Sequence, residues 1–355
     1  MQNSLFDFPH LEINKPIRLI TLFSGIGSQE MAMRDIGADF EIHFMCEFDK
    51  YAVQSYNAIH GTNFKPSDIR DIHGSDLKVT DKDKYCYLMT YSFPCTDLSV
   101  AGKMKGMSKA DWENGNSTRS GLLWEVERIL KECKKDELPQ ILLMENVPQV
   151  HAEQNMADFE SWLAFLRSRG YHNHWQDLNA KDYGIPQNRD RCFCVSILSD
   201  EFIDFEFPKP IKLEKVMRDF LEDQVDEKYY IKSEKAEKLI AELIERGELP
   251  TEQNRTDCHL RKTVSITGME NDNPKYQAKC SMTDCASTLL ARDYKGPANF
   301  AKMNGVIERS NRTESCNMLG MMGTEGFEKV RRVYATDALV PAISTKEDRI
   351  KILTE

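Results

Sequence analysis

The sequence predicts an α/β protein with a doubly wound, largely parallel sheet and a second, smaller domain. Short apolar runs typical of buried strands, such as Ile17–Phe23 and Ile141–Met144, alternate with segments of helical periodicity. The first run leads through a glycine turn into a helix, which is how a dinucleotide-type unit begins. After Pro208 the composition changes and long apolar periods become rare. We therefore expect one domain over residues 1–208 and another over residues 209–355.

Length and composition describe a globular chain. It has 355 residues, 41% of them hydrophobic, and a net charge of -10, which suits one large or two medium domains. The N-terminus lacks a basic start, and no apolar run approaches the ~18 residues that a membrane span needs, so we expect a cytoplasmic protein. The acidic balance argues against binding nucleic acid by bulk charge alone, but it leaves room for a local basic surface.

The ten cysteines include no CxxC pair. This spacing argues against a disulfide framework and against a zinc site, and we expect no bound metal. Cys192 and Cys194 alternate with Phe193 and Val195, so we expect both to pack on one face of a strand.

The glycine turn is Ser24-Gly-Ile-Gly-Ser28, and the helix after it can end at Gly37. The turn glycines let a ligand approach the backbone, and the helix N-terminus offers free amides. A second strand, Ile42–Cys46, ends at Glu47, where an acid can accept hydrogen bonds from ribose hydroxyls. Glu30 stands where the GxGxxG motif has its third glycine, which disfavours NAD and favours another adenosine cofactor. A simple turn with a solvated Glu47 is the alternative.

Two further helices are expected, one before and one after the apolar run Cys86–Met89. Asp49 can cap a helix that Gly61 closes, and a later amphipathic helix over Leu122–Leu130 buries one face. Between them, Asp68-Ile69 falls where a third strand should end.

Cys95 follows a predicted strand, Cys86–Met89, and begins a polar loop. In open α/β sheets, ligands and catalytic groups sit at this carboxyl end of the strands. Pro94 fixes its own φ and restricts the residue before it, so a stiff peptide presents the thiol. An isolated cysteine is more often a small buried core residue. Only the other motifs in the chain favour Cys95 as a catalytic nucleophile.

Ile141–Met144 is predicted to be a buried strand that ends in Glu145. An acid directly after four apolar residues is poorly hydrated, and desolvation raises a carboxyl pKa. Glu145 could therefore stay protonated and donate a hydrogen bond. A strand-end glutamate exposed to water is the alternative.

Arg189 and Arg191 lead into the last predicted strand of the first domain, Cys192–Ile197. This strand follows a helix around Trp162 and a strand over residues 173–178. In a strand the two arginines would point the same way and could jointly face an anion or a base edge. A solvated strand edge is the alternative.

The second domain should begin with a short amphipathic stretch, Leu213–Leu221. A helix over Ala236–Ile244 follows, with Gly247 as its stop. Residues 282–290 resemble residues 335–343, so each could be one small strand-turn unit.

Taken in order, these stretches resemble the cytosine-5 DNA methyltransferase family over roughly residues 17–200. The matching stretches are Phe23-Ser-Gly-Ile-Gly27, Glu47, Asp68-Ile69, Phe93-Pro-Cys95, Gly102-Lys-Met-Lys-Gly106, Thr118-Arg-Ser-Gly-Leu-Leu-Trp124, Glu145-Asn-Val147 and Gln187-x-Arg-x-Arg191. The resemblance implies the Rossmann-like doubly wound sheet of S-adenosylmethionine-dependent methyltransferases, with a target-recognition region after residue 208. It also implies methyl transfer from S-adenosylmethionine to carbon-5 of cytosine in double-stranded DNA.

The resemblance assigns the site residues as well. S-adenosylmethionine would be held by Phe23, Ser24, Gly25, Gly27, Glu47, Asp68, Ile69, Pro94 and Leu98. The target cytosine would be surrounded by Cys95, Glu145, Arg189 and Arg191. DNA would also be contacted by Lys103, Lys105 and Gln187.

In that chemistry the Cys95 thiolate adds to carbon-6 of a flipped-out cytosine, and carbon-5 then attacks the methyl group. A protonated Glu145 would stabilise charge at N3 of the ring, and Arg191 would do so at O2. The loop Val100–Met107 would close over the DNA. The family usually has Gln after the Pro-Cys pair, whereas this chain has Thr96, which alters contacts near the flipped base but leaves the nucleophile in place.

Three other functions stay open at this point. They are the same chemistry on a tRNA cytosine, the inactive DNA-binding part of a split enzyme, and an NAD oxidoreductase. The family's C-terminal motifs have no convincing counterpart before Glu355. We therefore expect the larger part of a split or truncated enzyme, with a second polypeptide supplying the missing segments.

Overall fold

The computed structural model describes residues 11–98, 106–116, 118–221, 230–231, 234–247, 259–267, 279–287, 303–310 and 317–319. The chain divides into two compact units, Met1–Leu178 with Asp190–Lys209, and Asn179–Arg189 with Pro210–Glu355. The boundary expected after residue 208 lies beside one of these divisions. The assignment of Asn179–Arg189 to the second unit was not predicted, and the roles expected for the two domains stay predictions.

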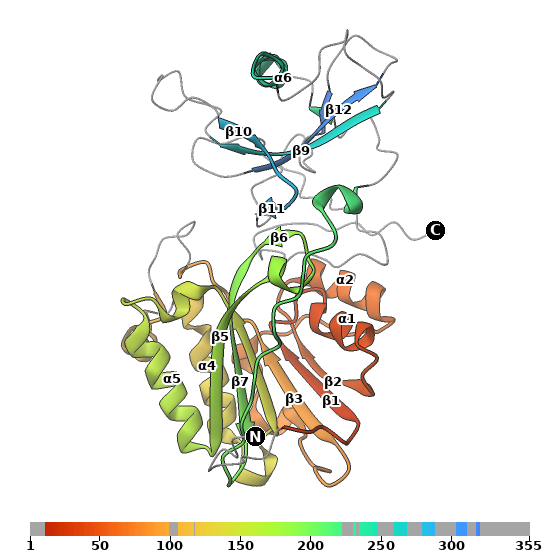
Figure 1. Cartoon of the computed structure of the whole chain (residues 1–355). Helices are drawn as coiled ribbons and strands as arrows, with labels where there is room; N and C mark the ends of the chain where they lie inside the picture. The colour runs from red at the N-terminus through yellow and green to blue at the C-terminus, as the bar shows by residue number, and fades with distance from the viewer. Residues whose placement is uncertain are drawn as a thin grey trace, which may run out of the picture. The chain divides into compact units, whose positions relative to one another are not determined.

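A six-stranded sheet forms the centre of the first unit (Figure 1), in the order β2-β1-β3-β4-β7-β5. Its strands are β1 (Ile17–Leu22), β2 (Phe40–Cys46), β3 (Cys86–Tyr91), β4 (Ile141–Asn146), β5 (Tyr171–Asn179) and β7 (Asp190–Leu198). The first four pair in parallel, and β7 runs antiparallel to β4. The predicted α/β class and doubly wound sheet are thereby confirmed.

Helices lie on both sides of this sheet (Figure 1). The α-helices are α1 (Ser28–Asp35), α2 (Lys50–His60), α3 (Lys109–Glu113), α4 (Leu123–Glu132) and α5 (Met156–Ser168). The short 3-10 helices are η1 (Ile69–Asp71), η2 (Gly74–Leu77), η3 (Ser120–Leu122), η4 (Lys135–Glu137) and η5 (Pro148–His151). Asp49 caps α2 by accepting hydrogen bonds from the Tyr51 and Ala52 amides, and Gly61 closes it with a φ of 66°, as the sequence predicted.

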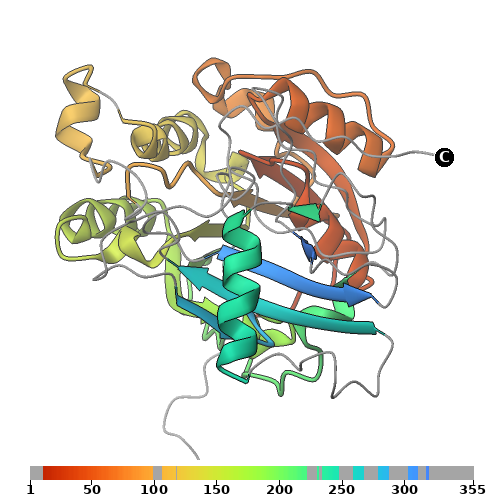
Figure 2. The same ribbon diagram turned by 90° about the horizontal axis from the view of Figure 1, so that it is seen from above.

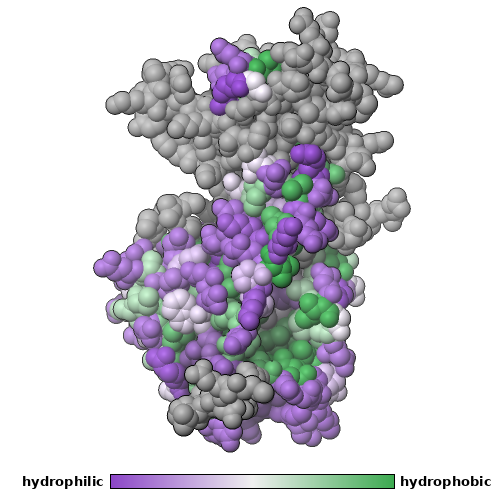
Figure 3. Space-filling view, viewed as in Figure 1, coloured by the Kyte–Doolittle hydropathy of each residue, from purple (hydrophilic) through white to green (hydrophobic). Residues whose placement is uncertain are grey.

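Strand residues alternate between two apolar layers. One face contributes Ile20 and Met89 to the large core with α4 and α5, and the other contributes Leu19 to a smaller layer with Met33 of α1. Figure 3 shows hydrophobic residues gathered over part of the sheet, in the lower half of the view. Both faces of the sheet are therefore covered by apolar layers, which leaves the carboxyl ends of the parallel strands as the place for a site.

The second unit contains a five-stranded antiparallel sheet, in the order β10-β9-β12-β13-β8. Its elements are η6 (Ala180–Tyr183), η7 (Met217–Phe220), β8 (Tyr230–Ile231), α6 (Glu234–Glu245), β9 (His259–Thr267), β10 (Lys279–Met282), β12 (Met303–Ser310) and β13 (Asn317–Leu319). Figure 2 shows α6 lying across this sheet. The predicted helix is confirmed, and its Ile240 and Leu243 are buried. A separate pair joins β6 (Gln187–Asn188) to β11 (Ala286–Ser287) in parallel.

Two expected elements differ from the structure. Asp68-Ile69 ends no strand, because the Asp68 carboxylate accepts the Arg70 amide at 3.0 Å and begins η1 instead. Of the amphipathic stretch Leu213–Leu221, only η7 is helical. Residues 335–343, the second half of the expected repeat, lie outside the described residues. Within the described part of the chain, no helix has the length and apolar character to cross a membrane.

Candidate active site

Glu47 joins the glycine turn to the segment that follows β2. Its Oε2 accepts a hydrogen bond from the Gly25 amide at 2.9 Å, and its Oε1 accepts one from the Asp49 amide at 2.8 Å. Glu47 is only 5% exposed. Burial raises the pKa of its carboxyl group above the ordinary value, although these amides act to lower it. Carboxylate oxygens can accept more than one hydrogen bond each, so Glu47 retains capacity for hydroxyl donors.

The turn itself has the features of a ligand cradle. The Ser24 hydroxyl is buried and has no hydrogen-bond partner among the described atoms, although buried polar groups normally have one. Gly25 has a φ of 58°, and a Cβ there would meet no atom within 4 Å. Phe23 also has a positive φ, which is uncommon outside glycine and concentrates at functional sites. An adenosine with ribose hydroxyls fits this combination of an acidic acceptor, an unpartnered hydroxyl and open backbone.

Gly27 serves close packing at the start of α1. Its φ is 83°, and a Cβ at this position would lie 2.1 Å from His60 Nε2 and 2.8 Å from the Tyr56 ring. Because α2 approaches the turn this closely, only glycine fits. The predicted contact of Gly27 with the cofactor stays a prediction.

Asp68 begins η1 with its carboxylate held in one orientation. Its Oδ1 accepts hydrogen bonds from both the amide and the Nε of Arg70, each at 3.0 Å. The Arg70 side chain lowers the pKa of Asp68 below its usual value, so the group is a carboxylate at neutral pH. Ile69, beside it, is buried.

The peptide that carries Cys95 is fastened by two side chains. Asn146, the last residue of β4, donates from Nδ2 to the Phe93 carbonyl at 2.9 Å. Ser120 of η3 donates from Oγ to the Pro94 carbonyl at 2.6 Å. The half-buried Cys95 therefore sits on a turn that is held from two directions.

Leu98 and Thr96 complete this turn. The Leu98 amide donates to the Cys95 carbonyl at 3.0 Å, and the Leu98 side chain is buried. The Thr96 hydroxyl is buried and has no partner among the described atoms. A second unpartnered hydroxyl next to Cys95 again fits a ligand with hydrogen-bonding groups.

Glu145 and Arg191 form an ion pair beside that turn. Arg191 Nε donates to Glu145 Oε1 at 2.9 Å, across the antiparallel pair of β4 and β7. The Glu145 side chain is 26% exposed, so it is less dehydrated than its position after an apolar run suggested. The pair places an acid and a guanidinium side by side at one end of the sheet.

Arg189 does not share a strand with Arg191. It lies between β6 and β7, and its amide donates to Asn179 Oδ1 at 3.1 Å. The prediction that both arginines lie in one strand is therefore wrong, and their joint contact with an anion or a base edge stays a prediction. Arg189 also belongs to the second unit, whereas Arg191 belongs to the first.

The predicted DNA contacts are placed only in part. Gln187 is buried in β6 and pairs with Ala286 of β11, within the second unit. Lys103 and Lys105 lie outside the described residues, and their predicted contacts with DNA stay predictions.

Cys192 and Cys194 are both buried in β7, as expected for one face of a strand. Cys192 lies beside a contact in which His151 Nε2 is 3.0 Å from each Asp177 carboxylate oxygen. A His151 ring nitrogen, an Asp177 oxygen and the Cys192 sulfur all lie within 4.8 Å of one another. Burial raises the pKa of the Cys192 thiol, and Asp177 raises it further, so the sulfur stays protonated at neutral pH. This contact ties η5, which begins three residues after Glu145, to β5.

Asn146 and Ser120 are the positioning residues that the sequence did not single out. Both stand inside stretches that carried the family resemblance, and Asn146 directly follows Glu145. Their hydrogen bonds reach segments 53 and 26 residues away, and no local pattern reveals such bonds. The sequence signal for a role of Asn146 and Ser120 was their position within those stretches.

Comparisons with known proteins agree on one family. A family model described as "C-5 cytosine-specific DNA methylase" matches residues 17–314. The type II methyltransferase M2.ScrFI of Lactococcus lactis subsp. cremoris is 32% identical over 270 residues, which cover 61% of this chain and 71% of that protein. The orphan methyltransferase M.SssI of Spiroplasma monobiae is 43% identical over 175 residues, which cover 49% of this chain and 42% of that protein.

A third relative and one solved structure are also similar to part of this chain. The type II methyltransferase M.NlaX of Neisseria lactamica is 36% identical over 214 residues, which cover 60% of this chain and 62% of that protein. The Entamoeba histolytica methyltransferase EhMeth aligns with a TM-score of 0.49 at 18% identity, covering 62% of this chain and 64% of that one. The chain thus spans less than two thirds of the length of most of these proteins.

Proposed function

The chain belongs to the C-5 cytosine-specific DNA methylase family, and from this premise we propose that it transfers a methyl group from S-adenosylmethionine to carbon-5 of cytosine in DNA. One observation carries the proposal. The hydrogen bond from Asn146 to the Phe93 carbonyl ties the Cys95 turn to the end of β4, where Glu145 meets Arg191. The nucleophile and the acid therefore lie at the carboxyl ends of the neighbouring parallel strands β3 and β4, and the start of the antiparallel β7 brings the Arg191 cation to Glu145.

Cys95 supplies the nucleophile in this proposal. Its thiolate adds to carbon-6 of the cytosine, forming a carbon–sulfur bond and making carbon-5 electron-rich. S-adenosylmethionine, when bound, supplies the methyl group that carbon-5 takes. Loss of the carbon-5 proton then breaks the bond to Cys95 and restores the thiolate. The turn held by Asn146 and Ser120 keeps the sulfur in place for both steps.

Glu145 and Arg191 stabilise the charge that addition creates on the ring. In this proposal Glu145, which accepts from Arg191 in the free chain, takes up a proton from solvent as the cytosine binds and donates it toward N3, while Arg191 donates toward O2. The ion pair between them fixes both groups before the base arrives, which lowers the cost of ordering them. Because carbon-6 is stacked inside duplex DNA, the base must leave the helix to reach Cys95.

The direct test of this function uses the purified chain, labelled S-adenosylmethionine, mixed duplex DNA and, in a parallel reaction, tRNA. We expect label in 5-methylcytosine of the duplex. Label in tRNA alone would support the RNA rival. Label in neither, with an added C-terminal segment of a relative present, would contradict the proposal.

Glu47 should make cofactor affinity depend on pH. Both of its oxygens accept backbone amides, so Glu47→Gln sets an NH₂ group against one amide and should weaken S-adenosylmethionine binding by roughly 1.5–3 kcal/mol. Ribose hydroxyls need the carboxylate form. Burial raises the pKa of Glu47 above its usual value, so wild-type affinity should be complete above that pKa and fall as the pH falls through it.

Calorimetric titrations across pH 5 to 8 measure both effects. Glu41→Gln is the matched control, because Glu41 lies on β2, which Glu47 directly follows, but is exposed, and it should keep the wild-type pH profile. Equal affinity and an equal profile in Glu47→Gln would mean that Glu47 does not bind the cofactor.

The need for a second polypeptide stays a prediction. If segments of another chain complete the cofactor site, the purified 355-residue chain should methylate poorly by itself. Adding a separately made C-terminal segment of a relative should then raise its activity. Full activity and tight cofactor binding by the chain alone would contradict this expectation.

A further inference from the structure

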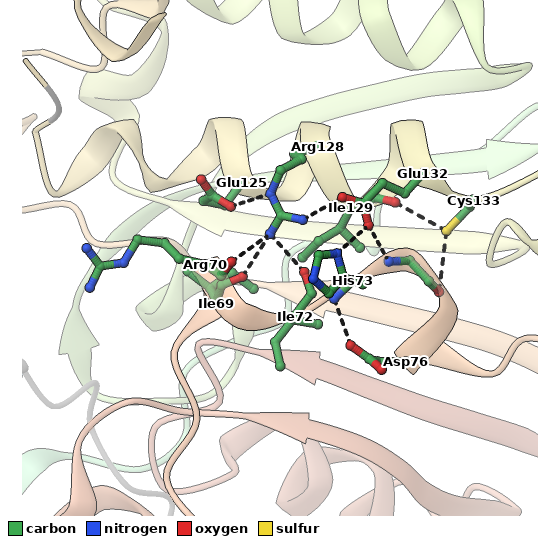
Figure 4. Close-up of polar contacts among 11 residues, drawn as sticks. Ile69, Arg70, Ile72, His73, Asp76, Glu125, Arg128, Ile129, Glu132 and Cys133 are labelled. Carbon is green, nitrogen blue, oxygen red and sulfur yellow. Dashed lines mark hydrogen bonds and ion pairs between the residues drawn. The ribbon is translucent and has the colours of Figure 1, made fainter. Parts of the chain in front are cut away.

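Arg128 of α4 is bonded through all three guanidinium nitrogens (Figure 4). Its Nε donates to Glu125 at 2.7 Å, and its Nη1 donates to Glu132 at 2.8 Å. Its Nη2 lies against three backbone carbonyls of η1 and the residue after it. These contacts are Ile69 at 3.2 Å, Arg70 at 3.4 Å and Ile72 at 2.8 Å.

These carbonyls need a partner for a physical reason. The last carbonyls of a helix are left for side chains or water, and these three carbonyls lie at the end of η1, where the Ile69 carbonyl also accepts the Ile72 amide at 3.2 Å. A guanidinium is planar and can serve several acceptors at fixed angles, whereas a lysine ammonium is a compact point charge. Arg128 therefore caps η1 from the side while its own orientation is fixed by Glu125 and Glu132.

Glu132 holds the next part of the same segment. Its Oε2 accepts the Gly74 amide at 2.9 Å and lies 3.1 Å from His73 Nδ1. Gly74 also touches α4 directly, because a Cβ there would lie 2.9 Å from the Cys133 backbone nitrogen, the Cys133 sulfur and the Ile129 carbonyl. Backbone atoms of a helix cannot move aside, so only glycine allows this approach.

The fastened segment begins at Asp68. The Asp68 carboxylate is oriented by the amide and Nε of Arg70, and the Arg70 carbonyl is one of those that Arg128 holds. Thus a chain of contacts leads from Arg128 through the Arg70 backbone to the Asp68 carboxylate.

We propose that Arg128 is a positioning residue for the cofactor site, which fixes the backbone of residues 69–72 and thereby the Asp68 carboxylate and Ile69 that receive S-adenosylmethionine. This inference rests on the proposed function, since that function assigns Asp68 and Ile69 to the cofactor. Arg128 acts through the segment that it holds, so its loss should weaken cofactor binding without slowing the chemistry of bound substrates.

The test compares two variants that disturb the segment in different ways. Arg128→Lys keeps the charge but loses the fork, and Gly74→Ala pushes the segment away from α4. For both we expect the Kd and KM for S-adenosylmethionine to rise about tenfold, while kcat at saturating cofactor and the KM for DNA stay near wild type. Arg167→Lys is the control, because Arg167 makes only an exposed ion pair with Glu160 on α5 among the contacts described.

Hydrogen exchange without cofactor supplies a second, independent measurement. We expect faster exchange of the amides of residues 69–77 in Arg128→Lys and Gly74→Ala, and no change in Arg167→Lys. Wild-type exchange in Arg128→Lys would overturn the proposal, as would faster exchange with an unchanged Kd. If wild-type protein binds no S-adenosylmethionine, the proposed function fails, and the positioning of Asp68 for that cofactor fails with it, while the exchange data still report whether Arg128 fixes the segment.

Discussion

Cys95→Ala should lower methyl transfer by roughly 10⁴-fold or more, because removing a covalent nucleophile leaves only binding and charge stabilisation. Cofactor affinity should stay near wild type, since the thiol acts on the base. The Phe93 and Pro94 carbonyls keep their partners, Asn146 and Ser120, so the turn should keep its shape. Methyl transfer assays and calorimetry on the same preparation measure the two effects.

Cys285→Ala is the matched control for this substitution. Cys285 is also a half-buried cysteine, but it lies in the second unit, and its loss should leave activity near wild type. A Cys95→Ala protein that still methylates at the wild-type rate would rule out Cys95 as the nucleophile.

Glu145→Gln should lower kcat by about 10²–10³-fold, because the proton that Glu145 gives to N3 is needed as charge builds on the ring. The glutamine can still accept the hydrogen bond from Arg191 Nε, which Glu145 receives at 2.9 Å. DNA affinity should therefore change far less than kcat.

Glu160→Gln is the control for that variant, because Glu160 lies exposed on α5. Single-turnover rates and DNA binding curves separate the two readouts. Equal losses in rate and in DNA affinity would assign Glu145 a positioning role instead of an acid role.

Local patterns predicted most of the first unit. The strand at Ile17–Leu22 and the helix between Asp49 and Gly61 were predictable because apolar periods and caps act within a few residues. The same holds for the buried strand that ends at Glu145. At these places local sequence preference and tertiary packing favour the same structure, so neighbouring residues alone are enough to predict the element.

The features that sequence could not supply depend on distant partners. The Asp68 segment reads as a strand end, but the structure shows a short helix whose carbonyls are held by Arg128, 56 to 59 residues later. Arg189 reads as leading into the same strand as Arg191, but it lies between β6 and β7, where its amide donates to Asn179. Neither partner is visible in local periodicity, because each acts through the folded chain.

The most direct measurement of the central claim is covalent trapping of the enzyme on a duplex in which 5-fluorocytosine replaces a cytosine that the enzyme methylates. Fluorine cannot leave carbon-5 as a proton does, so the bond to the enzyme should persist after methyl transfer. Our account predicts an adduct that survives denaturation, requires S-adenosylmethionine, and maps by peptide mass spectrometry to Cys95. An adduct on another residue, or methylation of normal DNA with no adduct on the fluorinated site, would contradict it.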